Sequence, residues 1–220
     1  MIAMLPVLAL AVTAAPMHAS GATPHYPRLT RFPDAAVMAR VNADLAAKEK
    51  ANASDYKECL SDLHDAGQKP DSDTWSVNAS VTYLSAHFLS VGVTSSNYCG
   101  GAYPNNGVQT PVTYDLSTGS EIDWKTAFKP GFLTGGLNTL YRAAYPKSSD
   151  AQCRSFVREQ PPFASPEDAV FRLETGKGLV VLPDFPHAMQ GCAQEVTLPA
   201  ARLAPFLRNA NLLNELGAMK

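Results

Sequence analysis

The strongest enzyme-like feature of the sequence is a histidine close to an aspartate. His187 follows Asp184 in the segment Pro183–His187, where the carboxylate could orient the imidazole ring for acid–base chemistry. The sequence contains no Gly-x-Ser-x-Gly elbow, His-Glu-x-x-His motif, P-loop or dinucleotide fingerprint. The pair therefore lacks an evident nucleophile. A hydrolase with its site near His187 is the alternative function, and we predict no catalytic residue.

A second group of polar residues lies at the end of a helical segment. Asp62, His64 and Asp65 could in principle bind a metal ion or exchange a proton. Adjacent charges at a helix end are usually solvated, and perturbed acids and bases are expected in clefts instead. We therefore predict neither a metal site nor a cofactor.

Binding chemistry gathers in one short connection, Tyr98–Gly107. Its tyrosines, Tyr98 and Tyr103, offer rigid amphipathic contact area, and Asn105 and Asn106 can both donate and accept hydrogen bonds. Such groups suit sugar rings and protein interfaces equally, so these four residues and His187 are the predicted ligand-binding residues. In the alternative interpretation, the glycine pair of the loop only turns the chain and the tyrosines pack beneath it.

The amino-terminal segment predicts export. Residues 1–27 contain no Asp, Glu, Lys or Arg, and Met1–Ala15 is an apolar run followed by small residues. This pattern predicts a signal peptide over residues 1–22, too short to span a membrane, with cleavage after Ala14, Ala19 or Ala22. The alternative is a disordered apolar leader or a core helix. We expect a periplasmic or secreted protein.

Charge and length exclude several classes of protein. The 220 residues include 18 Lys and Arg against 20 Asp and Glu, a net charge of −2. This balance provides no basic footprint for nucleic acid and no polybasic membrane patch. No later apolar run reaches the ~18 residues of a membrane span, so we expect no membrane anchor after signal cleavage. Residues 23–220 are predicted to form a single domain.

Four cysteines, Cys59, Cys99, Cys153 and Cys192, are scattered along the chain without a Cys-x-x-Cys pair. In an oxidising compartment an even number of such cysteines indicates two disulfides. Three pairings are open. We expect Cys59–Cys99 and Cys153–Cys192, because each bridge then stays within one half of the chain.

The polar segments are positioned by strands and helices that the hydrophobic spacing predicts. Period-two alternation is clearest from Trp75 to Tyr83. Strands are predicted over residues 75–83, 87–93, 112–116, 171–175, 179–182 and 196–198, with a short one at 122–124. Helical spacing covers residues 34–45, 56–63, 133–141 and 203–216. Strands joined by short turns pair antiparallel, so we predict an α+β fold with two groups of antiparallel strands and helices packed on one side.

Three segments together resemble a domain-of-unknown-function family of exported bacterial proteins. Its best-known members are the extracytoplasmic C-terminal domains of the anti-sigma factor RsiV and the peptidoglycan deacetylase PdaC. The first similar segment runs from Leu89 through Gly100–Pro104 to Leu116, the second from Ser117 to Phe128, and the third from Leu179 to Pro199. Tyr103 stands where the family usually has His, and Phe185-Pro186-His187 stands where a Tyr is common.

The resemblance implies a non-catalytic ectodomain, which in the anti-sigma factor binds lysozyme. We therefore expect an exported domain that binds a cell-envelope ligand, either a lysozyme-like muramidase or a peptidoglycan glycan. An inhibitor that protects the wall by occupying a muramidase cleft is a related role. The competing class is the envelope-acting hydrolase near His187.

Overall fold

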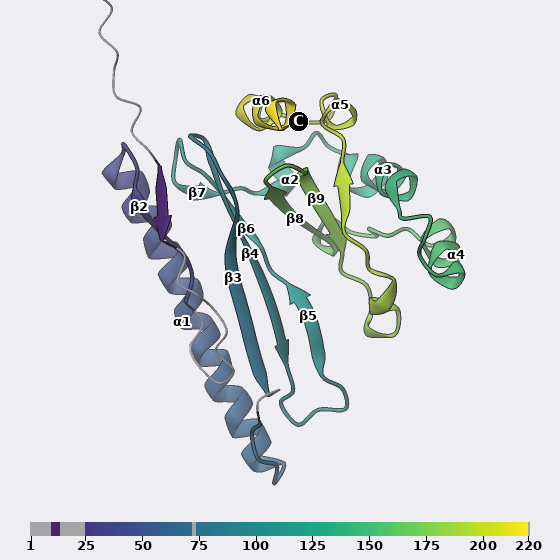
Figure 1. Ribbon diagram of the computed structural model, residues 1–220. Helices are drawn as coiled ribbons and strands as arrows, with labels where there is room; N and C mark the ends of the chain where they lie inside the picture. Colours follow the sequence, from purple (N-terminus) through teal and green to yellow (C-terminus); the bar gives the residue numbers. More distant parts are fainter. Residues whose placement is uncertain (1–9, 14–24, 72–73, 220) are drawn as a thin grey trace, which may run out of the picture. The chain divides into compact units, whose positions relative to one another are not determined.

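The computed structural model describes residues 10–13, 25–71 and 74–219 (Figure 1). The chain divides into two compact units, one ending at Glu121 and one beginning at Ile122, which are described separately. The fold is α+β with antiparallel sheets, as predicted. Among the described helices, none combines the length and apolar character that crossing a membrane requires.

Most of the predicted signal peptide, 1–22, lies outside the described residues, together with all three candidate cleavage points. Within it, the described strand β1 (Ala11–Thr13) pairs antiparallel with β2 (Arg28–Arg31).

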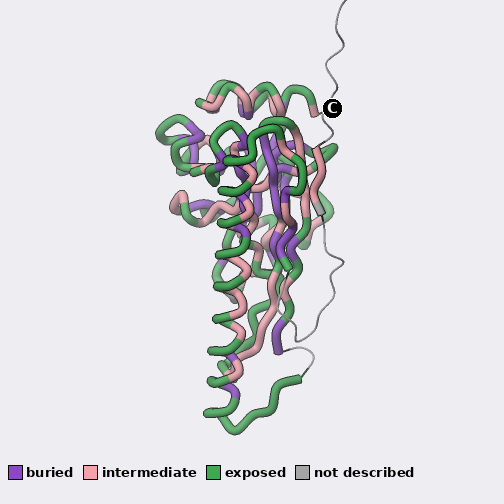
Figure 2. Tube along the Cα trace, turned by 90° about the vertical axis from the view of Figure 1, so that its left-hand side faces the viewer, coloured by how far each residue is buried: buried purple, intermediate pink, exposed green. Residues whose placement is uncertain are grey.

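The long helix α1 (Ala35–Asp65) opens the first unit. Asp34 caps it, since its carboxylate accepts from the backbone N–H groups of Ala36 and Val37. The prediction of two separate helical pieces was wrong, because α1 continues through Asn52–Ser54. The Asn52 amide donates to the Tyr26 hydroxyl at 2.7 Å instead of ending the helix. Figure 2 shows buried and half-buried residues along one side of α1 and exposed residues along the other.

The sheet of the first unit contains β3 (Trp75–Leu84), β4 (Phe88–Asn97), β5 (Asn105–Gln109), β6 (Val112–Asp115) and β7 (Ser120–Glu121). The strand order is β3-β4-β6-β7. β5 also pairs with β4, at Thr94–Asn97, whereas β6 pairs with β4 at Phe88–Val91. Alternate residues of β3 and β4 face α1, as period two requires. The core between helix and sheet includes Val37, Val41, Leu45, Ala79, Leu89, Val91, Val93, Val112, Tyr114 and Leu116.

Polar contacts fasten α1 to its neighbours. The hydroxyl of the buried Tyr114 donates to Asp44 Oδ2 at 2.6 Å. Burial is the main cause that raises the pKa of Tyr114, and the hydrogen bond to Asp44 raises it further. Glu49 Oε2 accepts from Tyr26 N and from the Arg28 guanidinium, both at 2.9 Å. Burial raises the pKa of Glu49, but these bonds outweigh it and leave that pKa below its ordinary value.

Two local predictions, one for the segment that forms β5 and one for residues 122–124, were wrong. Strand β5 lies where we predicted a loop, and residues 122–124 form no strand, since Asp123 instead caps the short helix α2 (Trp124–Ala127) of the second unit. β5 escapes detection because Asn105–Gln109 lacks apolar alternation.

The second unit packs helices on the sheet β10-β9-β8. β8 (Ala169–Glu174) and β9 (Gly178–Pro183) form the predicted hairpin, and β10 (Val196–Leu198) pairs with β9. α3 (Leu137–Ala144) follows one π-helical turn, Phe132–Gly136. The core includes the largely or fully buried aromatics Phe128, Phe132, Tyr141, Phe163 and Phe171.

Two helices of the second unit differ from prediction. α4 (Ala151–Glu159) has one buried residue, Val157, so its apolar spacing was too weak to identify. The predicted C-terminal helix is split into α5 (Ala200–Leu203) and α6 (Ala210–Ala218). Between them the backbone bonds with Ala127–Lys129 instead of continuing the helix, as in the Lys129 N–H bond to the Phe206 carbonyl.

Candidate functional site

The connection between β4 and β5 is joined covalently to α1. The disulfide Cys59–Cys99 has a Cα–Cα distance of 4.8 Å, and the second disulfide, Cys153–Cys192, lies within the second unit. Both join the cysteines in the pairing expected from the sequence. The loop lies at the end of the sheet beside the C-terminal end of α1 (Figure 1).

Glycine is required where the loop turns against the helix. Gly100 has φ +83°, a conformation that L side chains rarely adopt, and a Cβ there would lie 3.3 Å from the Ala66 Cβ. The Tyr98 N–H donates to the carbonyl of Thr74, the residue before β3, at 2.9 Å, which fixes the start of the loop. The loop thus has a rigid base.

Beyond this base, every residue from Gly101 to Val108 is exposed. Tyr103 is 70% exposed and Val108 is 38% exposed, and these are the exposed large hydrophobic residues of the described chain. Tyr98 is half-buried. The interpretation in which both tyrosines pack beneath the loop therefore does not hold for Tyr103.

The two asparagines lie on β5, an edge strand that is paired with β4 in the described structure. The Asn105 amide donates to Asn97 Oδ1 at 3.1 Å, which holds Asn105 against β4. Asn106 is exposed, and the neighbouring Gly107 N–H donates to Ser96 Oγ at 3.0 Å. The structure thus brings Tyr98, Tyr103 and both asparagines together in one loop and strand.

The fifth predicted ligand-binding residue, His187, belongs to the second unit. It begins a short 3-10 helix, His187–Cys192, and its side chain lies outside the described part of the structure. Asp184 is exposed, and its N–H donates to the Asp168 carbonyl at 2.7 Å.

The cluster at the end of α1 shows only surface contacts. His64 Nδ1 lies 3.4 Å from Asp65 Oδ1, and both side chains are largely exposed. Within residues 10–13, 25–71 and 74–219, no group of three or more His, Cys, Asp or Glu residues could hold a metal ion.

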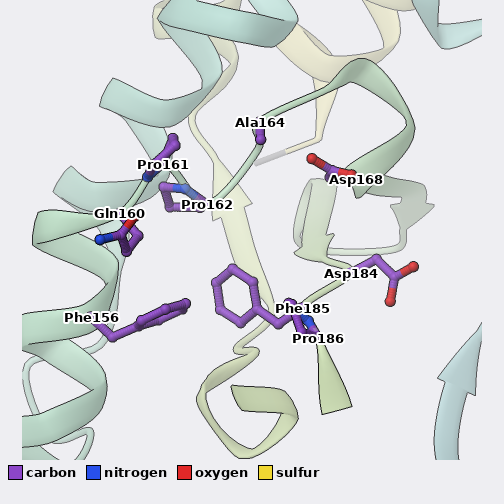
Figure 3. Close-up of a pocket in the computed structure, with 9 residues that line it drawn as sticks. All are labelled: Phe156, Gln160, Pro161, Pro162, Ala164, Asp168, Asp184, Phe185 and Pro186. Carbon is purple, nitrogen blue, oxygen red and sulfur yellow. The ribbon is translucent and has the colours of Figure 1, made fainter. Parts of the chain in front are cut away.

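A pocket of about 610 Å³ lies in the second unit (Figure 3). Its walls carry Phe156 and Phe185, and two aspartates, Asp168 and Asp184, line the opposite side. Sequence reasoning singled out Asp184 but missed the pocket, because α4 was not recognised. The proline-rich segment Gln160–Pro162 was the one available signal.

Solved structures of two DUF3298 family proteins are among those that resemble the chain. A member of the DUF3298 family from Bacteroides fragilis NCTC 9343 matches with a TM-score of 0.62 and 14% identity, over 95% of this chain and 98% of that one. This chain has the fold of a DUF3298 protein. A DUF3298 family protein from Pseudomonas aeruginosa PAO1 matches with a TM-score of 0.45 and 16% identity, over 63% of each chain.

At these identities the likeness concerns the fold. No protein-family model matches the sequence, and no curated protein does. The solved neighbours belong to a domain-of-unknown-function family, as the sequence motifs suggested, and they assign no ligand.

Proposed function

We propose that this is an exported, non-catalytic protein that binds a cell-envelope ligand through the recognition loop, defined as Tyr98–Gln109. The observation that carries the proposal is Tyr103, a large aromatic side chain held 70% exposed on a loop with a rigid base. Tyrosine is enriched among the residues that dominate the binding energy of protein interfaces.

The shape of the loop favours a protein ligand over a glycan. Small ligands are usually held in concave pockets that cover most of their surface. The run from Gly101 to Val108 is exposed and does not enclose a ligand in this way. It instead offers side chains that a partner's cleft could enclose. Of the two expected ligands, a lysozyme-like muramidase, whose substrate cleft is concave, fits this loop better than a peptidoglycan strand.

The rigid base supports tight binding because less conformational freedom is lost when the complex forms. The disulfide at Cys99, the Gly100 turn and the Asn105 bond to Asn97 each limit the loop before it meets a partner. Export is part of the proposal, because two disulfides are stable in oxidising compartments and the apolar leader is typical of a secretory signal.

Calorimetry with the oxidised protein tests the proposal. We expect heat of binding with hen lysozyme as the muramidase probe, and a much weaker signal with soluble peptidoglycan fragments. Tyr103→Ala should weaken binding at least ~30-fold, the equivalent of about 2 kcal/mol for a dominant interface residue. Tyr103→Phe keeps the ring and should retain most of the affinity. Arg31→Ala, an exposed change on β2, is the remote control.

The results separate the alternatives. Binding that also blocks muramidase turnover would indicate an inhibitor that occupies the cleft. Absence of heat with both ligands would refute the proposal. Release of soluble fragments from peptidoglycan, lost in His187→Ala, would support the hydrolase instead.

A further inference from the structure

We propose that the pocket of the second unit is a binding site for an organic cation with an apolar body, such as an aromatic amine or a basic side chain beside an aromatic one. This site is separate from the recognition loop and does not depend on the function proposed for it. Its volume of about 610 Å³ falls in the ~300–1,000 Å³ range of small-ligand pockets.

The apolar wall is built from two aromatic rings and the prolines beside them. Phe156 on α4 and Phe185 after β9 meet edge to face, with ring centroids 5.1 Å apart and planes at 86°. Phe156 is half-buried, while Phe185 is 6% exposed, so the ring of Phe156 is the more accessible of the two. Pro162 and Pro186 also line the pocket, and they extend the apolar surface with little side-chain freedom to lose.

The walls are held in place before any ligand arrives. The disulfide Cys153–Cys192 joins α4 to the 3-10 helix that follows Pro186. Cys153 lies about one helical turn before Phe156 on α4. Arg142 Nη2 donates to the Gln160 carbonyl at 2.9 Å. The Asn138 amide donates to the Phe163 carbonyl at 2.8 Å and accepts from the Phe163 N–H at 2.9 Å. These contacts fix both ends of the segment that carries Pro161 and Pro162.

Charge decides the class of ligand. In Figure 3 the two lining carboxylates, Asp168 and Asp184, lie on the side of the pocket away from Phe156. Asp168 accepts from the Ser165 N–H at 2.6 Å and from Ser165 Oγ at 3.0 Å, which orients its carboxylate. The Asp184 carboxylate points away from the rings (Figure 3). A ligand that lies over Phe156 and extends across the pocket would bring a cationic group at its other end to the side lined by Asp168 and Asp184.

Three phenethyl probes of the same size isolate the charge term. Ligand-observed NMR titrations of the oxidised full chain would compare phenethylamine, 2-phenylethanol and phenylacetate. We expect the amine to bind about 3- to 10-fold tighter than the alcohol, since a rim ion pair contributes modestly in water, and the acid to bind weakest. A capped dipeptide, acetyl-Phe-Lys-amide, distinguishes a peptide ligand from a free amine. Tighter binding of the dipeptide would indicate a peptide ligand, and tighter binding of phenethylamine would indicate a small aromatic amine.

Variants separate the rim from the wall. Asp184→Asn should lower the amine-to-alcohol ratio, with Asp168 still lining the pocket, and leave alcohol binding unchanged. Glu58→Gln, the same charge change on α1, should alter neither. Phe156→Ala should weaken all the probes at least ~5-fold, as expected for loss of an aromatic contact. Circular dichroism would confirm that each variant is folded. Equal binding of amine and acid, or no saturable binding of either cation, would overturn the proposal.

Discussion

Removal of the Cys59–Cys99 bridge provides the sharpest test of how the recognition loop is held. The bridge closes a sequence separation of 40 residues that includes β3 and β4. In the chain-entropy account, a loop of this length lowers the entropy of the unfolded chain enough to stabilise the fold by about 4 kcal/mol. Because small domains are stable by only about 5–15 kcal/mol, the double variant Cys59→Ala/Cys99→Ala should stay folded with much of its stability lost.

The assay is urea unfolding followed by tryptophan emission. The chain has two tryptophans, and Trp75 lies in β3 while Trp124 lies in α2. In a Trp124→Phe background, emission therefore reports on the first sheet alone. The variant should lose about 3–4 kcal/mol of unfolding free energy.

The second disulfide supplies a matched control. In a Trp75→Phe background, in which Trp124 reports on the second unit, Cys153→Ala/Cys192→Ala removes a bridge with a separation of 39 residues, so its entropic effect should be the same within about 1 kcal/mol. Only loss of the first bridge should also weaken binding by the recognition loop. A loss below about 1 kcal/mol for Cys59→Ala/Cys99→Ala would refute the reasoning, because it would mean that the bridge hardly restricts the unfolded chain.

Three further predictions concern the first unit. Tyr114→Phe removes a hydrogen bond to a charged acceptor and should cost about 2 kcal/mol in urea unfolding, so an unchanged midpoint would contradict it. Gly119→Ala should lower the free energy of unfolding by more than the ~1–2 kcal/mol that an L residue loses in the left-handed conformation. The reason is that φ is +73° and the new Cβ would also lie 3.1 Å from the Val37 carbonyl oxygen. As a comparison from the second unit, Gly131→Ala, at φ +78° with open space around it, should show the backbone cost alone. Because folding lowers the pKa of Glu49, its carboxylate stabilises the fold at pH values above its unfolded pKa of about 4.3. This stabilisation is lost as the pH falls through the folded pKa. Glu49→Gln should therefore be less stable than wild type at neutral pH, and a gap that persists unchanged at pH ~2 would be inconsistent with this linkage.

The sequence predicted the parts of the fold in which burial repeats regularly. Residues 75–83 alternate because one face of β3 packs on α1. The hairpin over 171–182 was indicated by the turn at Gly176–Gly178 between an alternating segment and a continuous apolar one. The disulfide pairing was also accessible, since each bridge stays within its half of the chain.

Elements without a regular apolar face could not be found in this way. β5 is a polar edge strand, and its pairing with β4 depends on backbone bonds that leave no hydrophobic signature. α4 buries Val157 alone.

The candidate sites were predictable to different degrees. The recognition loop was accessible because its residues are contiguous in sequence. The pocket was not, because it combines residues 156–168 with residues 184–186, which only the folded chain brings together.

The distribution of buried residues along α1 implies uneven local stability. Val37, Val41 and Leu45 are the buried residues of its first half, and Cys59 and Leu63 those of its last turns. None of the thirteen residues between Leu45 and Cys59 is buried. The central turns are held by polar contacts, chiefly those of Glu49. Amide hydrogens there should exchange with solvent sooner than those at either end, and acid should widen the difference. We therefore expect the central turns of α1 to open locally while its two ends stay packed.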